Sequence, residues 1–264
     1  MRFPIRLLLV LVMCCAGAAA WSQDYAREKR WADEVVPGLV VGEPIWLELA
    51  NGHKFLNVYT EARNAKVAVL LVHGIGVHPD HGLIGILRGK LNEMGYTTLA
   101  SQMPVARGEG ATVDDYYPVL FPQAGERIGS ATRFLQSKGY RQIVLLAHSM
   151  GAWMSNVHLL EAGAPPFAAW VVLGLTGRYW GASSISIPAL GIEWFPGRIR
   201  LPILDVYGEH DLKPTLAGVR SRAAALAHIP GSEQLMIAGS DHHYTGKEQE
   251  LAEAVHRFIA KTVR

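Results

Sequence analysis

A serine lies between small residues where an apolar run ends in Val144–Trp153, which reads VLLAHSMGAW. A strand that turns sharply into a helix would present Ser149 as a nucleophile, and such a turn requires small residues two positions to either side. Ala147 and Gly151 meet this requirement, although glycine is more usual at the first position. The alternative is a serine that only caps the helix, because serine is a common N-cap residue.

Partners for such a nucleophile occur in two later loops. An attacking serine needs a histidine as general base and a carboxylate that orients the imidazole. Asp211 follows an apolar run by three residues; Glu209 is a weaker candidate, and Asp205 within the run is expected to bond locally. The alternative for the aspartate is a turn or helix-start role. His242 and His243 follow the last apolar run, and we prefer His242 because it comes directly after a Gly-x-Asp turn.

The elements that must position these residues alternate regularly from residue 45. Two strands joined through Asn51-Gly52 predict a hairpin, because this pair tolerates positive φ. Apolar runs then alternate with helical patterns, with strands expected at 67–74, 97–104, 141–148, 167–175, 201–208 and 231–239 and helices at 82–95, 124–139, 149–163, 216–228 and 246–264. This order predicts an α/β fold: a mainly parallel twisted sheet with helices on both faces and an N-terminal antiparallel hairpin. Ligands of such sheets bind beyond the carboxyl ends of the strands, where the candidate residues fall.

Glycines follow the first of these parallel strands. Gly74 and Gly76 let the backbone approach a substrate oxygen and aim an amide at it. The second donor would be the amide of Met150, at the start of the helix after the serine. A dinucleotide site is not expected, because Pro79 stands where the third glycine of that motif belongs. The preferred role of His73 is structural, ordering this loop.

A metal site is the alternative use of the histidines in this loop. His78, Asp80 and His81 cluster near His73 and are residue types that bind zinc. Their spacing matches no standard zinc motif, and Pro79 constrains the loop, so we prefer a polar rim and expect no metal or other cofactor. A solvated loop is the preferred interpretation of 114–117, which reads DDYY, over a contact with substrate.

The first twenty residues differ from the rest of the chain. Arg2 and Arg6 precede the apolar run LLLVLVM and a stretch of small residues, the layout of a secretory signal peptide cleaved after Ala20. The alternative is an uncleaved membrane anchor, but the run is short for a bilayer. We therefore expect a periplasmic or secreted protein whose mature chain, 21–264, is one domain.

Removal of this segment would change the composition. Both cysteines, Cys14 and Cys15, lie in it, so the mature chain would contain neither a disulfide nor a catalytic cysteine. Loss of Arg2 and Arg6 lowers the 25 lysines and arginines to 23, which equals the 23 aspartates and glutamates. This balance argues against nucleic acid or an anionic membrane surface as partner. The sequence leaves the oligomeric state open.

Together these motifs resemble the α/β-hydrolase superfamily across about residues 40–264, and more narrowly an uncharacterised group of exported bacterial hydrolase-like proteins. The resemblance implies these roles: Ser149 as nucleophile, Asp211 as acid, His242 as base, and the amides of Ile75 and Met150 as the oxyanion hole. Ala147 in place of glycine is the one departure in the serine motif. For the narrower group the resemblance implies no substrate.

The same resemblance places a small cap at 176–198, where this superfamily inserts lids. Tyr179, Trp180, Trp194 and Phe195 in that segment are candidates for an acyl pocket, because binding pockets are mainly apolar and aromatic. Ordinary core contacts are an equal alternative. The expected activity is hydrolysis of a small-molecule or acyl ester, carboxylesterase-like, with a thioester or amide as the less favoured substrate. The competing expectation is a non-catalytic binding or scaffold protein, because fold does not imply function.

Overall fold

The structure, a computed structural model, describes residues 23–108, 116, 119–162, 166–176, 198 and 200–263. Within these residues eight strands form one sheet in the order β1-β2-β4-β3-β5-β6-β7-β8. The strands are β1 (Glu43–Glu48), β2 (Lys54–Thr60), β3 (Val67–Val72), β4 (Thr97–Ser101), β5 (Gln142–His148), β6 (Ala169–Leu173), β7 (Ile203–Gly208) and β8 (Glu233–Ile237). The β1–β2 and β2–β4 pairs are antiparallel and all other pairs are parallel. The hairpin and the mainly parallel sheet agree with the sequence prediction, which did not specify the β2–β4 pairing.

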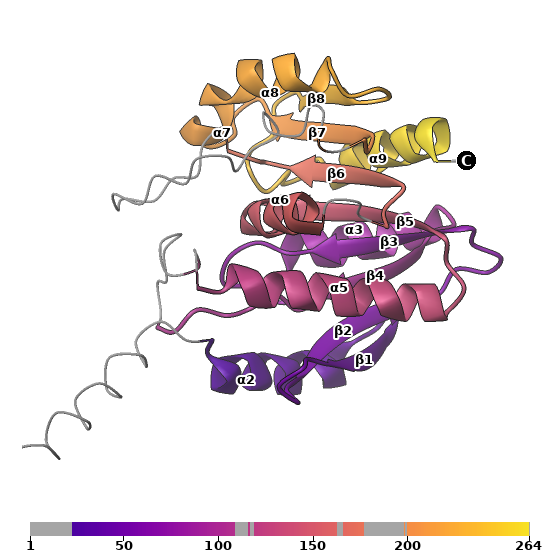
Figure 1. Ribbon diagram of the computed structural model, residues 1–264, viewed down its shortest axis with the longest axis vertical. Coiled ribbons are helices and arrows are strands. Elements are labelled where there is room, and N and C mark those ends of the chain that lie inside the picture. Colours follow the sequence, from indigo (N-terminus) through magenta and orange to yellow (C-terminus); the bar gives the residue numbers. More distant parts are fainter. Residues whose placement is uncertain are drawn as a thin grey trace, which may run out of the picture.

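Helices cover both faces of the sheet. They are α2 (Tyr25–Val35), the 3₁₀ helix η3 (Val36–Gly38), α3 (Gly82–Glu93), α5 (Phe121–Ser137), α6 (Met150–Ala162), α7 (Lys213–Ala217), α8 (Val219–Leu226) and α9 (Glu248–Thr262). Figure 1 shows α5 and α6 in front of the sheet and α3 behind it. Two buried apolar clusters follow from this layering, one between the sheet and α5, α6 and α8, the other between the sheet and α3 and α9.

The helices differ from the sequence prediction in three places. Helix α5 begins three residues earlier than expected, at Phe121, with a proline in its first turn, where the missing N–H has no intrahelical partner to lose. The single helix expected at 216–228 is two helices, α7 and α8, which meet at Gly218. Helix α2 was not predicted. It packs beside the hairpin, and Gln23 just before it forms a bridge with Ala106.

Two predicted segments lie outside the described residues: the signal peptide (1–20) and nearly all of the cap (176–198). Among the helices that the structure does describe, none is long and apolar enough to cross a membrane. Export therefore stays a prediction.

Candidate active site

Ser149 occupies the sharp turn between β5 and α6. Its φ is +56°, a left-handed conformation that a non-glycine residue adopts at a cost and that is concentrated at functional sites. The turn is held by the Ser149 amide, which donates to the carbonyl of Leu173 at 3.0 Å. A Cβ on Gly151 would lie 2.4 Å from the carbonyl oxygen of His73. The small residue that the sequence motif requires at this position therefore makes room for the end of β3.

Three sequence-predicted residues meet at this turn. The distance from His242 Nε2 to Ser149 Oγ is 3.0 Å, and that from His242 Nδ1 to Asp211 Oδ1 is 2.6 Å. Each residue follows a different strand, namely β5, β7 or β8, and the parallel order brings the carboxyl ends of these strands to one edge. His243, the other candidate base, is exposed beside them.

Asp211 is held as a carboxylate. Burial alone would raise its pKa, but the hydrogen bond from His242 and the nearby imidazole, together with two backbone donors, lower the pKa of Asp211 below its usual value. Those donors are the amides of Gly208, at 3.1 Å, and Leu212, at 2.7 Å. An ionised carboxylate on Nδ1 fixes the tautomer that leaves Nε2 free to accept a proton from Ser149.

Ile75 and Met150, the residues predicted as oxyanion donors, follow the neighbouring strands β3 and β5, and their role stays a prediction. Ile75 is in the loop after β3, and Met150 is the first residue of α6. Neither amide donates to an acceptor within the described part of the chain. The next amide, that of Gly76, donates to the hydroxyl of Tyr116 at 3.1 Å. Tyr116 is buried, so the expectation of a solvated loop at 114–117 is wrong for this residue, and the other three lie outside the described residues.

His73 orders the same loop, as expected. Its Nδ1–H donates to the carbonyl of Gly74 at 2.8 Å, and its Nε2 accepts from the amide of Met103 at 2.8 Å. Burial lowers the pKa of His73 to about 3, which keeps the ring neutral. Asp80 forms an ion pair with Arg88, and no group of three or more potential metal ligands occurs among the residues placed by the structure.

His148 supports the site in a way that the sequence analysis missed. Its Nε2–H donates to the carbonyl of His242 at 2.9 Å, and the two ring centroids are 4.9 Å apart. Burial, then the neighbouring His242, lowers the pKa of His148 to about 3. The neutral ring therefore fixes the backbone of the base without placing a second charge beside it.

Two further contacts hold the base loop. A Cβ on Gly174, after β6, would lie 2.8 Å from Cε1 of His242, so only glycine leaves room for the imidazole. Tyr244 is buried and its hydroxyl donates to the carbonyl of Val206 at 2.9 Å. A glycine at a strand end was a visible signal for the close approach of Gly174 to His242. No sequence pattern indicated the hydrogen bond from Tyr244 to Val206.

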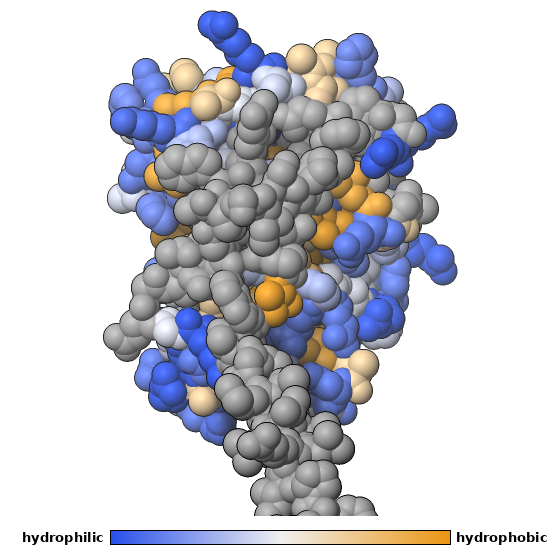
Figure 2. All heavy atoms as spheres, turned by 60° about the vertical axis from the view of Figure 1, so that its left-hand side comes forward, coloured by the Kyte–Doolittle hydropathy of each residue, from blue (hydrophilic) through white to orange (hydrophobic). Residues whose placement is uncertain are grey.

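A pocket of about 380 Å³ opens beside Ser149. We call it the α3 pocket; its lining residues are Gly74, Ile75, Val77, His81, Gly82, Leu83, Ile84, Ile86, His148, Ser149, His243, Thr245 and Glu248. Figure 2 turns the carboxyl ends of the strands toward the reader and shows hydrophobic side chains among hydrophilic ones on that face. The aromatic residues predicted to line an acyl pocket, Tyr179, Trp180, Trp194 and Phe195, lie outside the described residues.

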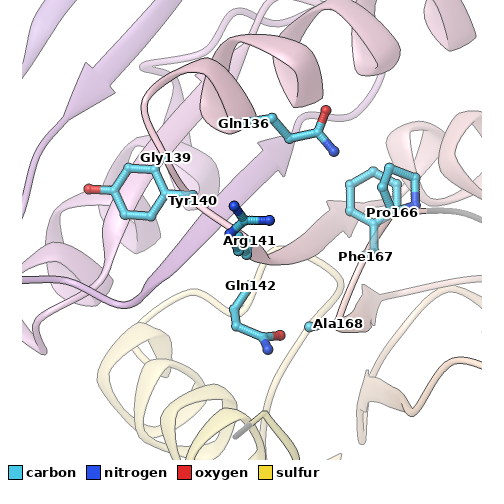
Figure 3. A pocket seen from close by; sticks show the side chains of 8 residues that line it. All are labelled: Gln136, Gly139, Tyr140, Arg141, Gln142, Pro166, Phe167 and Ala168. Carbon is cyan, nitrogen blue, oxygen red and sulfur yellow. The ribbon is translucent and has the colours of Figure 1, made fainter.

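A larger cavity, of about 480 Å³, lies at the other end of the sheet (Figure 3). Its lining includes Arg141 and Gln142, where β5 begins, whereas Ser149 follows the residue where β5 ends. This larger cavity is therefore separate from the Ser149 site. The α3 pocket is the one that adjoins Ser149.

Solved structures with this architecture are numerous. The esterase Pf2001 of Pyrococcus furiosus is 13% identical, with a TM-score of 0.64 over 84% of this chain and 93% of that chain. Est1E from Butyrivibrio proteoclasticus is 18% identical, with a TM-score of 0.62 over 83% and 98%. An alpha-beta serine hydrolase homologue from Coxiella burnetii is 16% identical, with a TM-score of 0.58 over 83% and 98%. No protein-family model and no curated protein matches the sequence. The chain has the α/β-hydrolase fold.

Proposed function

We propose that the protein is a serine hydrolase that cleaves a carboxylic ester through an acyl-enzyme. The observation that carries this proposal is the hydrogen-bonded chain Ser149–His242–Asp211 on a left-handed turn. A serine that merely caps a helix requires neither a histidine on its Oγ nor a buried carboxylate behind that histidine. Ala147 stands where glycine is usual in the serine motif. This difference does not weaken the proposal, because alanine is small and the residue is fully buried in β5.

In the proposed reaction, Oγ of Ser149 attacks the ester carbonyl carbon while Nε2 of His242 takes the hydroxyl proton. The amides of Ile75 and Met150 stabilise the negative charge that develops on the carbonyl oxygen. His242 then returns the proton to the leaving alcohol, and the C–O bond breaks to give the acyl-enzyme. Water then attacks the acyl carbonyl carbon while the same imidazole takes its proton. The bond from that carbon to Ser149 Oγ breaks, the imidazolium returns the proton to Oγ, and the acid is released. Asp211 stays ionised throughout and stabilises the imidazolium.

The choice of an ester is supported by the structural likeness to Pf2001, which is an esterase by name. The likeness to the serine hydrolase homologue supports hydrolysis by a serine without specifying the bond. The competing function, a binding or scaffold protein without turnover, is disfavoured by the intact hydrogen-bonded chain. A relic of a lost activity would have no need of left-handed strain at Ser149 or of an ionised Asp211.

A fluorophosphonate probe tests the proposal directly. The wild-type protein is expected to be labelled, and Ser149→Ala is expected to lose both labelling and p-nitrophenyl ester turnover, the latter by about 10³-fold or more. Ser137→Ala is the matched control, because Ser137 is exposed at the end of α5 that lies away from the site. Labelling of Ser149→Ala equal to that of the wild type, or tight ligand binding without turnover in the wild type, would contradict the proposal.

A further inference from the structure

The α3 pocket has two chemically different sides. Its apolar side chains come from the loop after β3 and from α3: Ile75, Val77, Leu83, Ile84 and Ile86. The facing residues after β8 are polar: His243, Thr245 and Glu248. Ile86 is 41% exposed, a large apolar side chain at the surface of the pocket rather than in the core. An apolar group bound here would cover it and gain the free energy of its burial.

The lining of the pocket identifies the half of an ester that fits it. Ser149 and the oxyanion residue Ile75 both line the pocket, so the carbonyl group would lie at its inner end. His242, which must pass its proton to the leaving oxygen, is not among the lining residues. The leaving group therefore belongs on the side of His242, and the acyl group belongs in the α3 pocket.

Charge further limits that acyl group. Glu248 lines the pocket, and no lysine or arginine does among the residues that the structure places there. The Glu248 carboxylate has no hydrogen bond or ion pair within the described chain; the adjacent Lys247 pairs with Glu250 instead. A carboxylate or phosphate on the acyl chain would meet this like charge without a lysine or arginine to balance it; the basic side chains of the lining are the histidines His81, His148 and His243.

We propose that the acyl half of the substrate is an apolar group without negative charge, which lies against α3 and is selected by Ile86 and Glu248. This inference rests on the proposed ester hydrolysis and names the substrate class of the same site. The pocket volume of about 380 Å³ is near the lower end of the roughly 300–1,000 Å³ typical of ligand pockets, so a larger side chain at Ile86 should shorten the accepted acyl chain.

The chain-length arm compares p-nitrophenyl acetate with p-nitrophenyl octanoate. In Ile86→Trp the ratio of kcat/KM for octanoate to that for acetate is expected to fall about tenfold or more, because filling an apolar pocket excludes methylene groups. Glu93→Trp is the matched control: it adds the same side chain to the exposed surface of α3, two turns further on and outside the pocket. A ratio that is the same in both variants would overturn the placement of the acyl group.

The charge arm compares two acyl groups of equal length, the mono-p-nitrophenyl ester of glutarate, which carries a carboxylate, and the p-nitrophenyl ester of pentanoate. The wild type is expected to prefer pentanoate. Glu248→Lys should raise the glutarate-to-pentanoate ratio of kcat/KM by about tenfold or more, since the variant replaces a like charge with a counter-charge. Glu253→Lys makes the same charge change on the exposed side of α9 outside the pocket, keeps the Lys247–Glu250 pair, and should leave the ratio near the wild-type value.

Fluorophosphonate labelling of Ser149 in each variant separates the two proposals. Labelled, active variants with unchanged ratios would overturn the acyl assignment while the hydrolase proposal stands. A wild-type protein that is neither labelled nor active would overturn the hydrolase proposal and the acyl assignment with it. Labelled variants whose ratios shift as stated, beside unshifted controls, support both.

Discussion

At the residue scale, the two adjacent histidines after β8 have different surroundings. His242 is buried between Ser149 and Asp211, whereas His243 is exposed and its ring centroid lies 5.3 Å from that of His242. The left-handed φ of Tyr244, +56°, turns the chain directly after this pair. Adjacent side chains in this loop therefore point to different sides, and only one imidazole faces the serine.

His242→Ala is expected to reduce ester turnover about as severely as Ser149→Ala, because residues that act as one unit give losses that do not add. The double variant should be little worse than either single variant. His243→Ala should keep kcat within about tenfold of the wild type, since its ring has no part in the proton transfer, and any change should fall mainly on KM because His243 lines the α3 pocket. Steady-state kinetics with one p-nitrophenyl ester checks all four proteins. An inactive His243→Ala beside an active His242→Ala would show that His243, not His242, is the base.

Sequence alone predicted the residues whose chemistry is tied to chain order. Ser149, Asp211 and His242 each follow a predicted strand, and their order matches the one expected for this triad. The residues that hold them were not predicted. His148 contacts a residue 94 positions away, and Tyr116 contacts Gly76, 40 positions away. Such contacts depend on how distant loops pack, which periodicity and spacing do not specify.

At the element scale, helix α2 is the part of the fold that sequence patterns missed. Its sequence, YAREKRWADEV, buries only Glu28 and Ala32, so it lacks the apolar stripe by which an amphipathic helix is recognised. It is held instead by charge. Both oxygens of Glu28 accept from Arg127 of α5 at 2.9 Å, and the Arg127 guanidinium carbon lies 4.9 Å from the centroid of the Phe55 ring.

Glu28→Ala is therefore expected to destabilise the fold by about 3–5 kcal/mol, because it leaves the fully buried Arg127 without its counter-charge. Asp33→Ala on the same helix is the control. Its partner Lys29 is exposed, and loss of such a surface pair is expected to change the free energy of unfolding by about 0.5 kcal/mol or less. Urea unfolding followed by circular dichroism measures both variants. Equal stability of the two would show that α2 is held by contacts other than this ion pair.

The split between α7 and α8 has a local cause. Periodicity predicted one helix over 216–228, but Gly218 is the C-cap of α7 and the N-cap of α8. Glycine is a poor helix-interior residue, which permits the break. Arg222 of α8 then reaches the buried Asp205 of β7 at 2.8 Å, so this second helix is fixed to the sheet by an ion pair. Asp205 therefore pairs with Arg222, 17 residues further on, rather than locally, and Asp211 is the carboxylate that contacts His242.

At the scale of the whole molecule, the sheet brings the proposed reactive residues and the residues that support them to one edge. Residues after β3, β5, β7 and β8 meet there, and the edge carries two buried neutral histidines, His73 and His148, beside the one proposed as base. Each of the two uses its ring as a donor to a backbone carbonyl. A neutral ring suits this purpose, because burial disfavours a positive charge both in the loop after β3 and beside His242.

These two histidines give the stability of the protein a defined pH dependence. In the folded state the pKa of each is lowered to about 3, whereas in the unfolded chain it is near the ordinary value of about 6.5. Between these values the unfolded state binds more protons than the folded state, so the free energy of unfolding falls as the pH falls. Each pKa unit corresponds to about 1.4 kcal/mol, so acidification from pH 7 to pH 4.5 should cost several kcal/mol in total.

Urea unfolding at pH 7 and at pH 4.5 measures this loss. In His148→Gln an amide N–H replaces the imidazole donor, and the side chain no longer titrates. The variant should be less stable than the wild type at pH 7 but should lose less stability on acidification, because His148 no longer contributes whereas His73, and the histidines His78 and His158 whose pKa burial also lowers, still do. The lowered pKa of Asp211 adds its own loss only at lower pH, below the ordinary range of a carboxyl group. An equal loss in the variant and the wild type would mean that His148 already takes up a proton in the folded protein, and the neutral ring beside His242 would have to be abandoned.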